Sequence, residues 1–286
     1  MPQASKSAPS AALATTIFLL GLSALCAWVG YFVLGRLGLV LGVLAVALLV
    51  GFSAGLSPEL AMRMQRGVRL TPQRAPELHA AVARLSRRAG IAAPALYLVP
   101  TPTPNALSAG ALGGRAALAV TSGLLELLSR DEYEAVIAHE IAHLRNRDTL
   151  LLRLAGSLLR TLQMLLRVAT WVALIGLLGR MLPLSIAIGV IVLATVLPWV
   201  AAALHQALSR TREFAADETA VELTGSPEAL ASALQKLGRV ERHWMTRALG
   251  VEDLPPWLRS HPATRERIER LRTHAGRAPP GRHRAA

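Results

Sequence analysis

The sequence predicts a mostly α-helical protein, in which an α+β domain with a small sheet is integrated with four transmembrane helices. The mean hydropathy of +0.41 and the apolar content of 52% are too high for an ordinary soluble domain. Long apolar runs occur in two pairs, and a membrane-spanning helix needs about 20 predominantly apolar residues. In the second pair, Arg167 interrupts the first run. Between and after these pairs, the chain has the charged, periodic segments of a domain outside the bilayer.

The first pair of apolar runs predicts a transmembrane hairpin. Ala11 to Leu34 is an uncharged stretch of 24 residues, which is too long for the apolar core of a signal peptide. A second uncharged stretch, Leu37 to Leu56, follows directly after Gly35 and Arg36. We therefore expect two spans joined by a very short outer loop.

A second apolar block runs from Thr161 to Leu204, with Arg180 near its middle and Pro183 shortly after. This pattern predicts another hairpin. Three arginines recur every seventh residue on one helix face around its start: Arg153, Arg160 and Arg167. They fit an amphipathic entry to the span whose arginines reach the membrane interface, and a re-entrant or interfacial segment is the alternative.

Charge bias predicts the orientation of these spans. The loops within the hairpins hold only Arg36 and Arg180, whereas the flanking segments are rich in arginine. By the positive-inside rule, both flanking segments are expected in the cytoplasm. A cytoplasmic tail (residues 1–10) is therefore predicted before the first hairpin (11–56). The soluble domain is predicted in two parts (57–157 and 206–275) on either side of the second hairpin (158–205), and a flexible end follows (276–286).

The net charge of +13 does not predict a nucleic-acid-binding protein. Only Lys6 and Lys236 among the 31 basic residues are lysine, and no aromatic-rich basic motif or phosphate-binding glycine loop accompanies them. The positive-inside rule and anionic lipid explain the charge, so the lipid bilayer is the expected partner. The single cysteine, Cys26, excludes an intrachain disulfide and a cysteine-rich zinc site.

The segment between the hairpins combines helix and strand patterns. Glu77 to Arg88 has helical periodicity. Ala95 to Val99 and Ala116 to Thr121 are short apolar runs bounded by proline or glycine, which predicts strands. Ser129 and Glu132 form a capping box, so a helix is expected to begin at Arg130.

The chain after the second hairpin is expected to be helical. Thr224 and Gly225 end one helix, and Ser226 and Pro227 begin the next as N-cap and first-turn proline. A further helix is expected to begin at Pro262.

The strongest chemical signal is His139-Glu140-Ile141-Ala142-His143, an H-E-x-x-H motif inside the predicted helix. Residues four apart lie on one helix face, so both imidazoles can bind one zinc ion. Glu140 can then take a proton from a zinc-activated water that attacks an amide carbonyl. Such a pattern arises by chance on the order of one time in a hundred in a chain of this length. The alternative is a pair of histidines that cap or pack in a basic helix.

A catalytic zinc site needs a third protein ligand and an open position for water. Glu213 is the best candidate, because it follows the second hairpin and is expected on the same side of the membrane as the histidines. Asp217 lies one turn further on the same face, where it could accept an N–H from a ligand histidine. A solvated carboxylate beside Arg210 and Arg212 is the alternative for Glu213.

The order of these motifs resembles the HtpX family of membrane heat-shock metalloproteases, which is related to the CAAX prenyl proteases. The resemblance covers roughly residues 10–272 and comprises a hairpin, H-E-I-A-H-L-R-N-R-D, a second hairpin, S-R-T-R-E-F-A-A-D and S-H-P-A-T-R-E-R-I. It implies a zincin-type metalloprotease domain with one Zn²⁺ per chain. The implied ligands are His139, His143 and Glu213, with Glu140 as the base and Asp217 supporting the site.

Two further segments match the family. Asn105 and Ala106 begin an N-A-x-x-x-G segment, which the resemblance places in a strand beside the cleft where a peptide could add through main-chain hydrogen bonds. A plain turn is the alternative. In similar proteins the segment around His261 lies near the active site, so His261 would stabilise an oxyanion or serve as an N-cap. Asn146 and Asp148 also match, without a chemical role that the sequence reveals.

We therefore expect hydrolysis of internal peptide bonds. The resemblance implies quality control of misfolded membrane proteins, at the cell (inner or plasma) membrane with the active site facing the cytoplasm. A CAAX-type processing protease is one alternative, and such relatives have more spans that enclose a chamber. A non-catalytic zinc-binding scaffold or chaperone is another, but it would close its site with four protein ligands, whereas three are found beside an intact Glu140.

Overall fold

The computed structural model describes residues 8–55, 57–111, 114–249 and 264–275. The chain divides into two compact units. The first comprises residues 1–56 and 149–211, and the second comprises residues 57–148 and 212–286.

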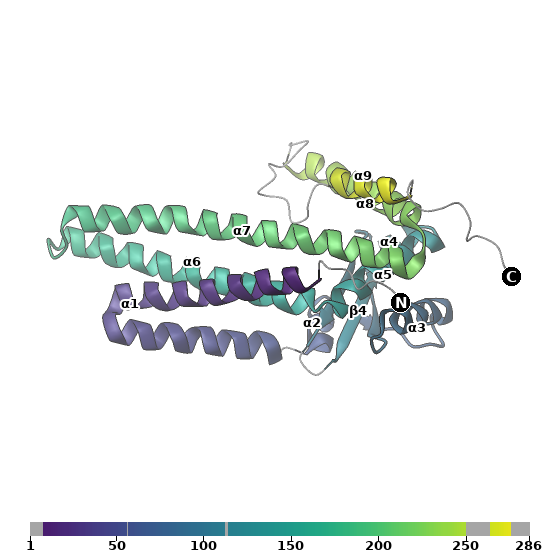
Figure 1. Ribbon diagram of the computed structural model, residues 1–286, viewed down its shortest axis with the longest axis horizontal. Helices are drawn as coiled ribbons and strands as arrows, with labels where there is room; N and C mark the ends of the chain where they lie inside the picture. Colours follow the sequence, from purple (N-terminus) through teal and green to yellow (C-terminus); the bar gives the residue numbers. More distant parts are fainter. Residues whose placement is uncertain (1–7, 56, 112–113, 250–263, 276–286) are drawn as a thin grey trace. The chain divides into compact units, whose positions relative to one another are not determined.

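The first unit consists of long apolar helices. α1 (Ala8–Gly55) turns back at Gly35, whose φ of 61° is a left-handed conformation that glycine adopts without strain. Figure 1 shows the resulting hairpin. The two halves approach so closely that a Cβ atom on Gly30 would overlap the carbonyl oxygen of Gly38. α6 (Asp148–Leu178) and α7 (Leu184–Thr224) form the second hairpin, which turns at Arg180.

The two hairpins predicted from the sequence are therefore confirmed as helical hairpins. Leu22 and Cys26 of α1 pack in one core with Leu158 and Leu162 of α6 and Ala201 of α7. Among the described residues, α6 and α7 are long and apolar enough to cross a membrane, whereas the halves of α1 contain shorter apolar helices. Four transmembrane helices thus stay a prediction.

The second unit contains a four-stranded mixed sheet in the order β1-β2-β4-β3. β4 pairs in parallel with β2 and antiparallel with β3, so β3 lies at the edge of the sheet. The two strands predicted from the sequence are confirmed as β2 and β4, and the strand implied by the family resemblance is β3. The strands are β1 (Val68–Arg69), β2 (Ala95–Val99), β3 (Ala106–Gly110) and β4 (Ala116–Thr121).

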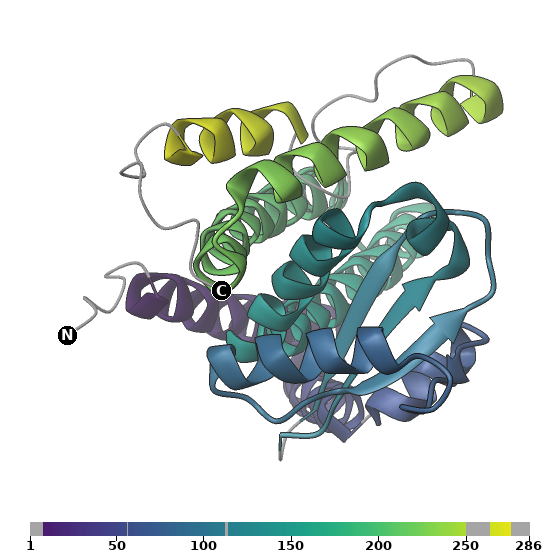
Figure 2. The ribbon, with the colours of Figure 1, turned by 90° about the vertical axis from the view of Figure 1, so that its right-hand side faces the viewer.

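Side chains alternate between the two faces of this sheet, as expected for strands. On one face, Leu96 and Leu118 join a core with α3 (Pro76–Ala89), α5 (Arg130–Arg145) and α8 (Pro227–Leu249), and Figure 2 shows α3 and α5 beside the sheet. On the other face, Tyr97 and Ala119 pack with Met62 of α2 (Pro58–Met64). Each fully buried leucine stabilises the fold by about 1.5–3 kcal/mol, so α5 is held firmly by the core on its apolar side.

α5 begins at Arg130, as its capping box predicts. The Ser129 N–H donates to Oε2 of Glu132 at 2.8 Å, and Ser232 and Lys236 of α8 also donate to this carboxylate, each at 2.7 Å. Burial alone raises the pKa of Glu132, but the three donors outweigh it and lower the pKa to about 2. The start of α5 is thus tied to α8.

The remaining helices complete the second unit. α4 (Ser122–Leu127) follows β4 directly. α7 ends at Thr224 and α8 begins at Pro227, which confirms both predicted boundaries. α9 (Thr264–Ala275) packs on α8, and its predicted start at Pro262 lies outside the described residues.

Candidate metal centre

Two imidazoles and one carboxylate converge in the second unit. His139 and His143 lie one turn apart on α5, and Glu213 lies on the part of α7 that belongs to the same unit. The two Nε2 atoms are 3.1 Å apart, and the Glu213 oxygens lie 3.5 Å from Nε2 of His139 and 3.6 Å from Nε2 of His143. All three side chains are buried, so this group is shielded from bulk water.

A carboxylate orients each imidazole through its other nitrogen. Asp217 Oδ1 lies 2.9 Å from Nδ1 of His139, and Asp148 Oδ2 lies 3.0 Å from Nδ1 of His143. An Nδ1–H that donates to a carboxylate leaves the Nε2 lone pair facing the other ligand atoms, which is the tautomer that a metal ion binds. The structure thus brings Asp217 to His139 and Asp148 to His143, and the sequence did not reveal the second contact.

Two buried arginines pair with these carboxylates. Arg267 of α9 donates to both oxygens of Asp217 at 2.7 Å and lies 2.9 Å from Oε2 of Glu213. Arg212 forms an ion pair with Asp148. Sequence reasoning missed both arginines. For Arg267, the available signal was its place in the S-H-P-A-T-R-E-R-I segment.

The buried charges favour a cation between the ligand atoms. In the described part of this cluster, three carboxylates face two guanidinium groups, which leaves one net negative charge as long as both imidazoles are neutral. Burial lowers the pKa of His139, but hydrogen bonds to Asp217 and Glu213 outweigh it and raise the pKa to about 9. Two imidazole nitrogens and a carboxylate form a donor set that suits zinc. The residues present therefore fit a zinc ion.

Glu140 lies beside the ligand group and is not part of it. Its carboxylate is half-buried, and its Oε2 accepts a hydrogen bond from Ser108 Oγ of β3 at 2.7 Å. Glu140 thus lies next to His139 in the sequence, and its carboxylate is bonded to the edge strand β3.

The other predicted site residues have different outcomes. Asn105 directly precedes β3, and Ala106 is the first residue of this strand. The Asn105 N–H donates to Thr121 Oγ1 at 2.8 Å, and its carbonyl accepts from the Thr121 N–H at 3.0 Å. Their role in peptide binding stays a prediction. His261 lies outside the described residues.

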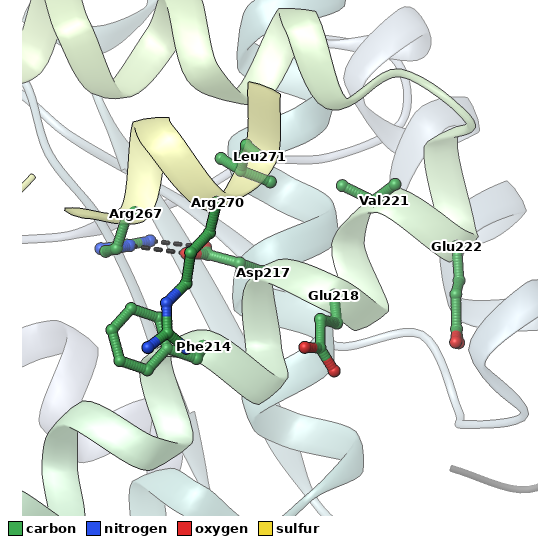
Figure 3. A pocket seen from close by; sticks show the side chains of 8 residues that line it. All are labelled: Phe214, Asp217, Glu218, Val221, Glu222, Arg267, Arg270 and Leu271. Atoms are coloured by element: carbon green, nitrogen blue, oxygen red, sulfur yellow. Dashed lines mark hydrogen bonds and ion pairs between the residues drawn. The ribbon is translucent and has the colours of Figure 1, made fainter. Parts of the chain in front are cut away.

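A cavity of about 180 Å³ lies between α7 and α9, next to Asp217. Figure 3 shows Asp217 bound to Arg267 at its wall, with the Arg270 guanidinium over the Phe214 ring at 3.7 Å from the centroid. None of the three converging ligands lines this cavity, nor does Glu140. This cavity is therefore separate from the group formed by His139, His143 and Glu213.

Comparison with known proteins identifies the family. Residues 72–275 match the model of peptidase family M48. The chain belongs to this family. Among curated relatives, this M48 chain is 36% identical over 271 residues to "Protease HtpX homolog" of Pyrococcus abyssi (strain GE5 / Orsay), with coverage of 90% of this chain and 94% of the relative. The homologue of the same name from Sulfurihydrogenibium sp. (strain YO3AOP1) is 33% identical over 287 residues, with coverage of 93% and 97%.

A solved structure supports the fold of this M48 chain. The crystal structure of S. mikatae Ste24p matches with a TM-score of 0.57 at 21% sequence identity. The match covers 80% of this chain, which spans 57% of the Ste24p chain. The resemblance to the HtpX family is thus confirmed, and the protein is a metalloprotease of family M48.

Proposed function

We propose that this M48 metalloprotease is a membrane-bound, zinc-dependent endopeptidase that hydrolyses internal peptide bonds. One observation carries the proposal: the two Nε2 atoms and the Glu213 carboxylate converge, with the Glu140 carboxylate beside them. Three protein ligands leave one position for water, which is typical of catalytic zinc, whereas structural zinc is closed by four protein ligands. We assign one zinc ion to each chain, bound by His139, His143 and Glu213.

Each group has a defined task in this reaction. Zinc, when bound, would supply a Lewis acid that polarises the substrate carbonyl and lowers the pKa of water to about 7. Glu140 takes a proton from the attacking water as the oxygen–carbon bond forms. It then delivers this proton to the departing nitrogen as the carbon–nitrogen bond breaks. Asp217 orients His139, and His261 is the proposed donor to the developing oxyanion.

We place the first unit in a membrane, with the active site facing the cytoplasm. The length and apolar composition of α6 and α7 support this placement, as does the apolar hairpin of α1. Large apolar side chains are exposed along these helices, which a soluble surface would disfavour and lipid would accept. Those that are more than 60% exposed include Leu37, Trp171, Ile175, Leu178 and Trp199. The arginine bias of the flanking segments supports the orientation.

The proposed substrates are misfolded membrane proteins of the cell membrane. Pairing with the main chain of the edge strand β3 would bind many extended sequences with little selectivity. Such tolerance suits quality control better than processing at one defined site, and quality control is also what the family resemblance implies.

The test compares the parent protein with Glu140→Gln in detergent, with added zinc and an unfolded protein substrate. We expect the parent to cleave and the variant to lose at least about 100-fold in kcat. Elemental analysis should find the same zinc content in both, because Glu140 is not a ligand. A Glu213→Ala variant should lose zinc as well as activity.

Other outcomes would contradict the proposal in different ways. Equal cleavage by the parent and Glu140→Gln would indicate a contaminating protease or a different base. Bound zinc without cleavage by either protein, across several substrates, would favour a scaffold or a narrowly specific processing protease.

A further inference from the structure

We infer that Ser108 is a positioning residue that holds Glu140 in place and ties it to the edge strand β3. The inference rests on the proposed endopeptidase function and deepens it. Through Ser108, the strand that would bind an extended peptide also fixes the position of the base, Glu140.

The hydrogen bonds of β3 show which of its main-chain groups point outward. Asn105 accepts from the Thr121 N–H at 3.0 Å, and the Ala111 N–H donates to the Arg115 carbonyl at 3.0 Å. In an antiparallel pair, residues that bond the partner strand alternate with residues that do not. Odd-numbered residues of β3 therefore bond β4. The N–H and C=O groups of Ala106 and Ser108 point away from β4, to an edge with which no other described strand pairs.

The side chain of Ser108 lies on the sheet face that α5 covers. Leu107 and Ala109 pack with Met62 on the opposite face, and successive side chains of a strand alternate. Ser108 Oγ donates to Oε2 of Glu140 at 2.7 Å. One residue thus presents its main chain to an incoming peptide and its hydroxyl to the base.

This hydrogen bond selects the oxygen of Glu140 that reacts. The single hydroxyl proton occupies Oε2 and fixes the rotation of the carboxylate, so that Oε1 receives the proton of the attacking water. Displacement of a catalytic group by about 1 Å can cost about 100-fold in rate. Ser108 does not itself exchange a proton with the substrate, and it acts through Glu140.

The same geometry sets the register of cleavage. A strand that pairs with the outward groups of Ser108 would lie about 4.8 Å from β3, next to the carboxylate that Ser108 holds. The peptide bond opposite Ser108 is then the one presented to the base. Ala106 and Gly110 lie on the same face as Ser108 and are small, which leaves room for the substrate's side chains.

The positioning role is tested with Ser108→Ala, Ser108→Thr and a matched control. We expect Ser108→Ala to lower kcat about 10-fold to 100-fold, with KM within about twofold of the parent. Ser108→Thr should restore kcat to within about threefold, because it keeps the hydroxyl and suits a strand. The control Ser122→Ala removes a half-buried hydroxyl that, within the described ranges, bonds the Thr101 carbonyl at 2.8 Å, so its kcat should be unchanged. Zinc content and the thermal midpoint should match the parent in all variants.

The edge is tested separately with Ala106→Pro. Proline removes the outward N–H of Ala106 and is tolerated where an edge strand has no partner. We expect KM to rise about tenfold while kcat falls by less than about threefold, since one of the few main-chain bonds to the peptide is lost.

The inference is overturned if Ser108→Ala keeps kcat within twofold of the parent, or if Ser108→Thr is as slow as Ser108→Ala. Equal decreases of kcat in Ser108→Ala and Ser122→Ala would show a structural defect and would also overturn the inference. Loss of zinc from Ser108→Ala would do the same. An unchanged KM in Ala106→Pro would overturn the role of the edge. Failure of the parent to cleave any substrate would instead overturn the proposed function itself.

Discussion

At the scale of single residues, the two nitrogens of each histidine in the metal-ligand group have separate tasks. Nε2 faces the other ligand atoms, and Nδ1 faces a carboxylate that fixes the ring. Burial alone would raise the pKa of Asp217, but hydrogen bonds from His139 and Arg267 outweigh it and lower the pKa. The Asp217 carboxylate therefore stays ionised and continues to accept the hydrogen bond that orients His139.

Asp148→Asn should lower the affinity for zinc about 10-fold to 100-fold, because an amide holds the His143 ring and its tautomer less firmly than a carboxylate. The affinity can be measured by competition with a chelator of known zinc affinity. Glu218→Gln, which changes an exposed acid next to Asp217, should leave the affinity unchanged. Equal affinities of the parent and Asp148→Asn would contradict the orienting role of Asp148.

The site residues that the sequence could predict are those related by helix geometry. His139 and His143 lie one turn apart, and so do Glu213 and Asp217. Helix geometry could not predict Arg267, because it meets Asp217 from 50 residues further along the chain. Local periodicity does not reveal which arginine of a basic sequence becomes buried on folding.

At the scale of elements, α5 is anchored at its first turn. Glu132 closes the capping box and also binds Ser232 and Lys236, so one carboxylate fixes the start of α5 and its contact with α8. The helix that carries His139 and His143 thus has its start fixed away from these two residues.

Glu132→Gln should lower the thermal midpoint at pH 7, since it removes on the order of 2 kcal/mol of stabilisation. The folded pKa of about 2 lies below the ordinary value of 4.5. The stabilisation is therefore fully present above pH 4.5 and is lost as the pH falls toward 2. The midpoints of parent and variant, measured in detergent across this range, should converge at low pH.

Asp131→Asn is the matched control, because it changes an exposed acid in the same first turn of α5. Its midpoint should follow that of the parent within about 1 °C. If the thermal midpoints of the parent and Glu132→Gln differed by the same amount from pH 7 to pH 3, the ionised carboxylate would be excluded as the source of the difference.

The elements that the sequence predicted are those with strong local signals. α3, α5, β2 and β4 have clear periodicity, caps or bounding prolines. β1 has two residues and exists because it pairs with β2, which local sequence cannot reveal. α2 and α4 are helices of 7 and 6 residues, too short for a periodic pattern to identify.

At the scale of the whole molecule, the predicted topology depends on the turns at Gly35 and Arg180, which both have left-handed backbone conformations. The pairing of apolar runs into hairpins could be predicted from the sequence, because charge and proline mark these turns. The number of membrane crossings could not be decided in the same way, because the same apolar pattern fits a span or a packed interfacial helix.

The topology can be tested by cysteine labelling in intact cells. Cys26 is the single cysteine and is buried, so the parent should react little with a membrane-impermeant maleimide. We expect Arg36→Cys and Arg180→Cys to be labelled from outside the cell. Arg74→Cys, in the second unit, should be labelled only after permeabilisation. The reverse pattern would place the active site outside the cytoplasm, and labelling of Arg180→Cys alone would contradict the first hairpin as a pair of spans.

The position of β3 at the edge of the sheet has a consequence for how substrates would be distinguished. An open strand edge offers amide and carbonyl groups to any chain whose own groups are unsatisfied. In a folded protein, more than about 90% of the buried groups of this kind are already paired. Damage that frees a segment from its native partners is then itself the feature recognised. Such a protease would bind segments that have lost their native structure and would need no recognition sequence in its substrates.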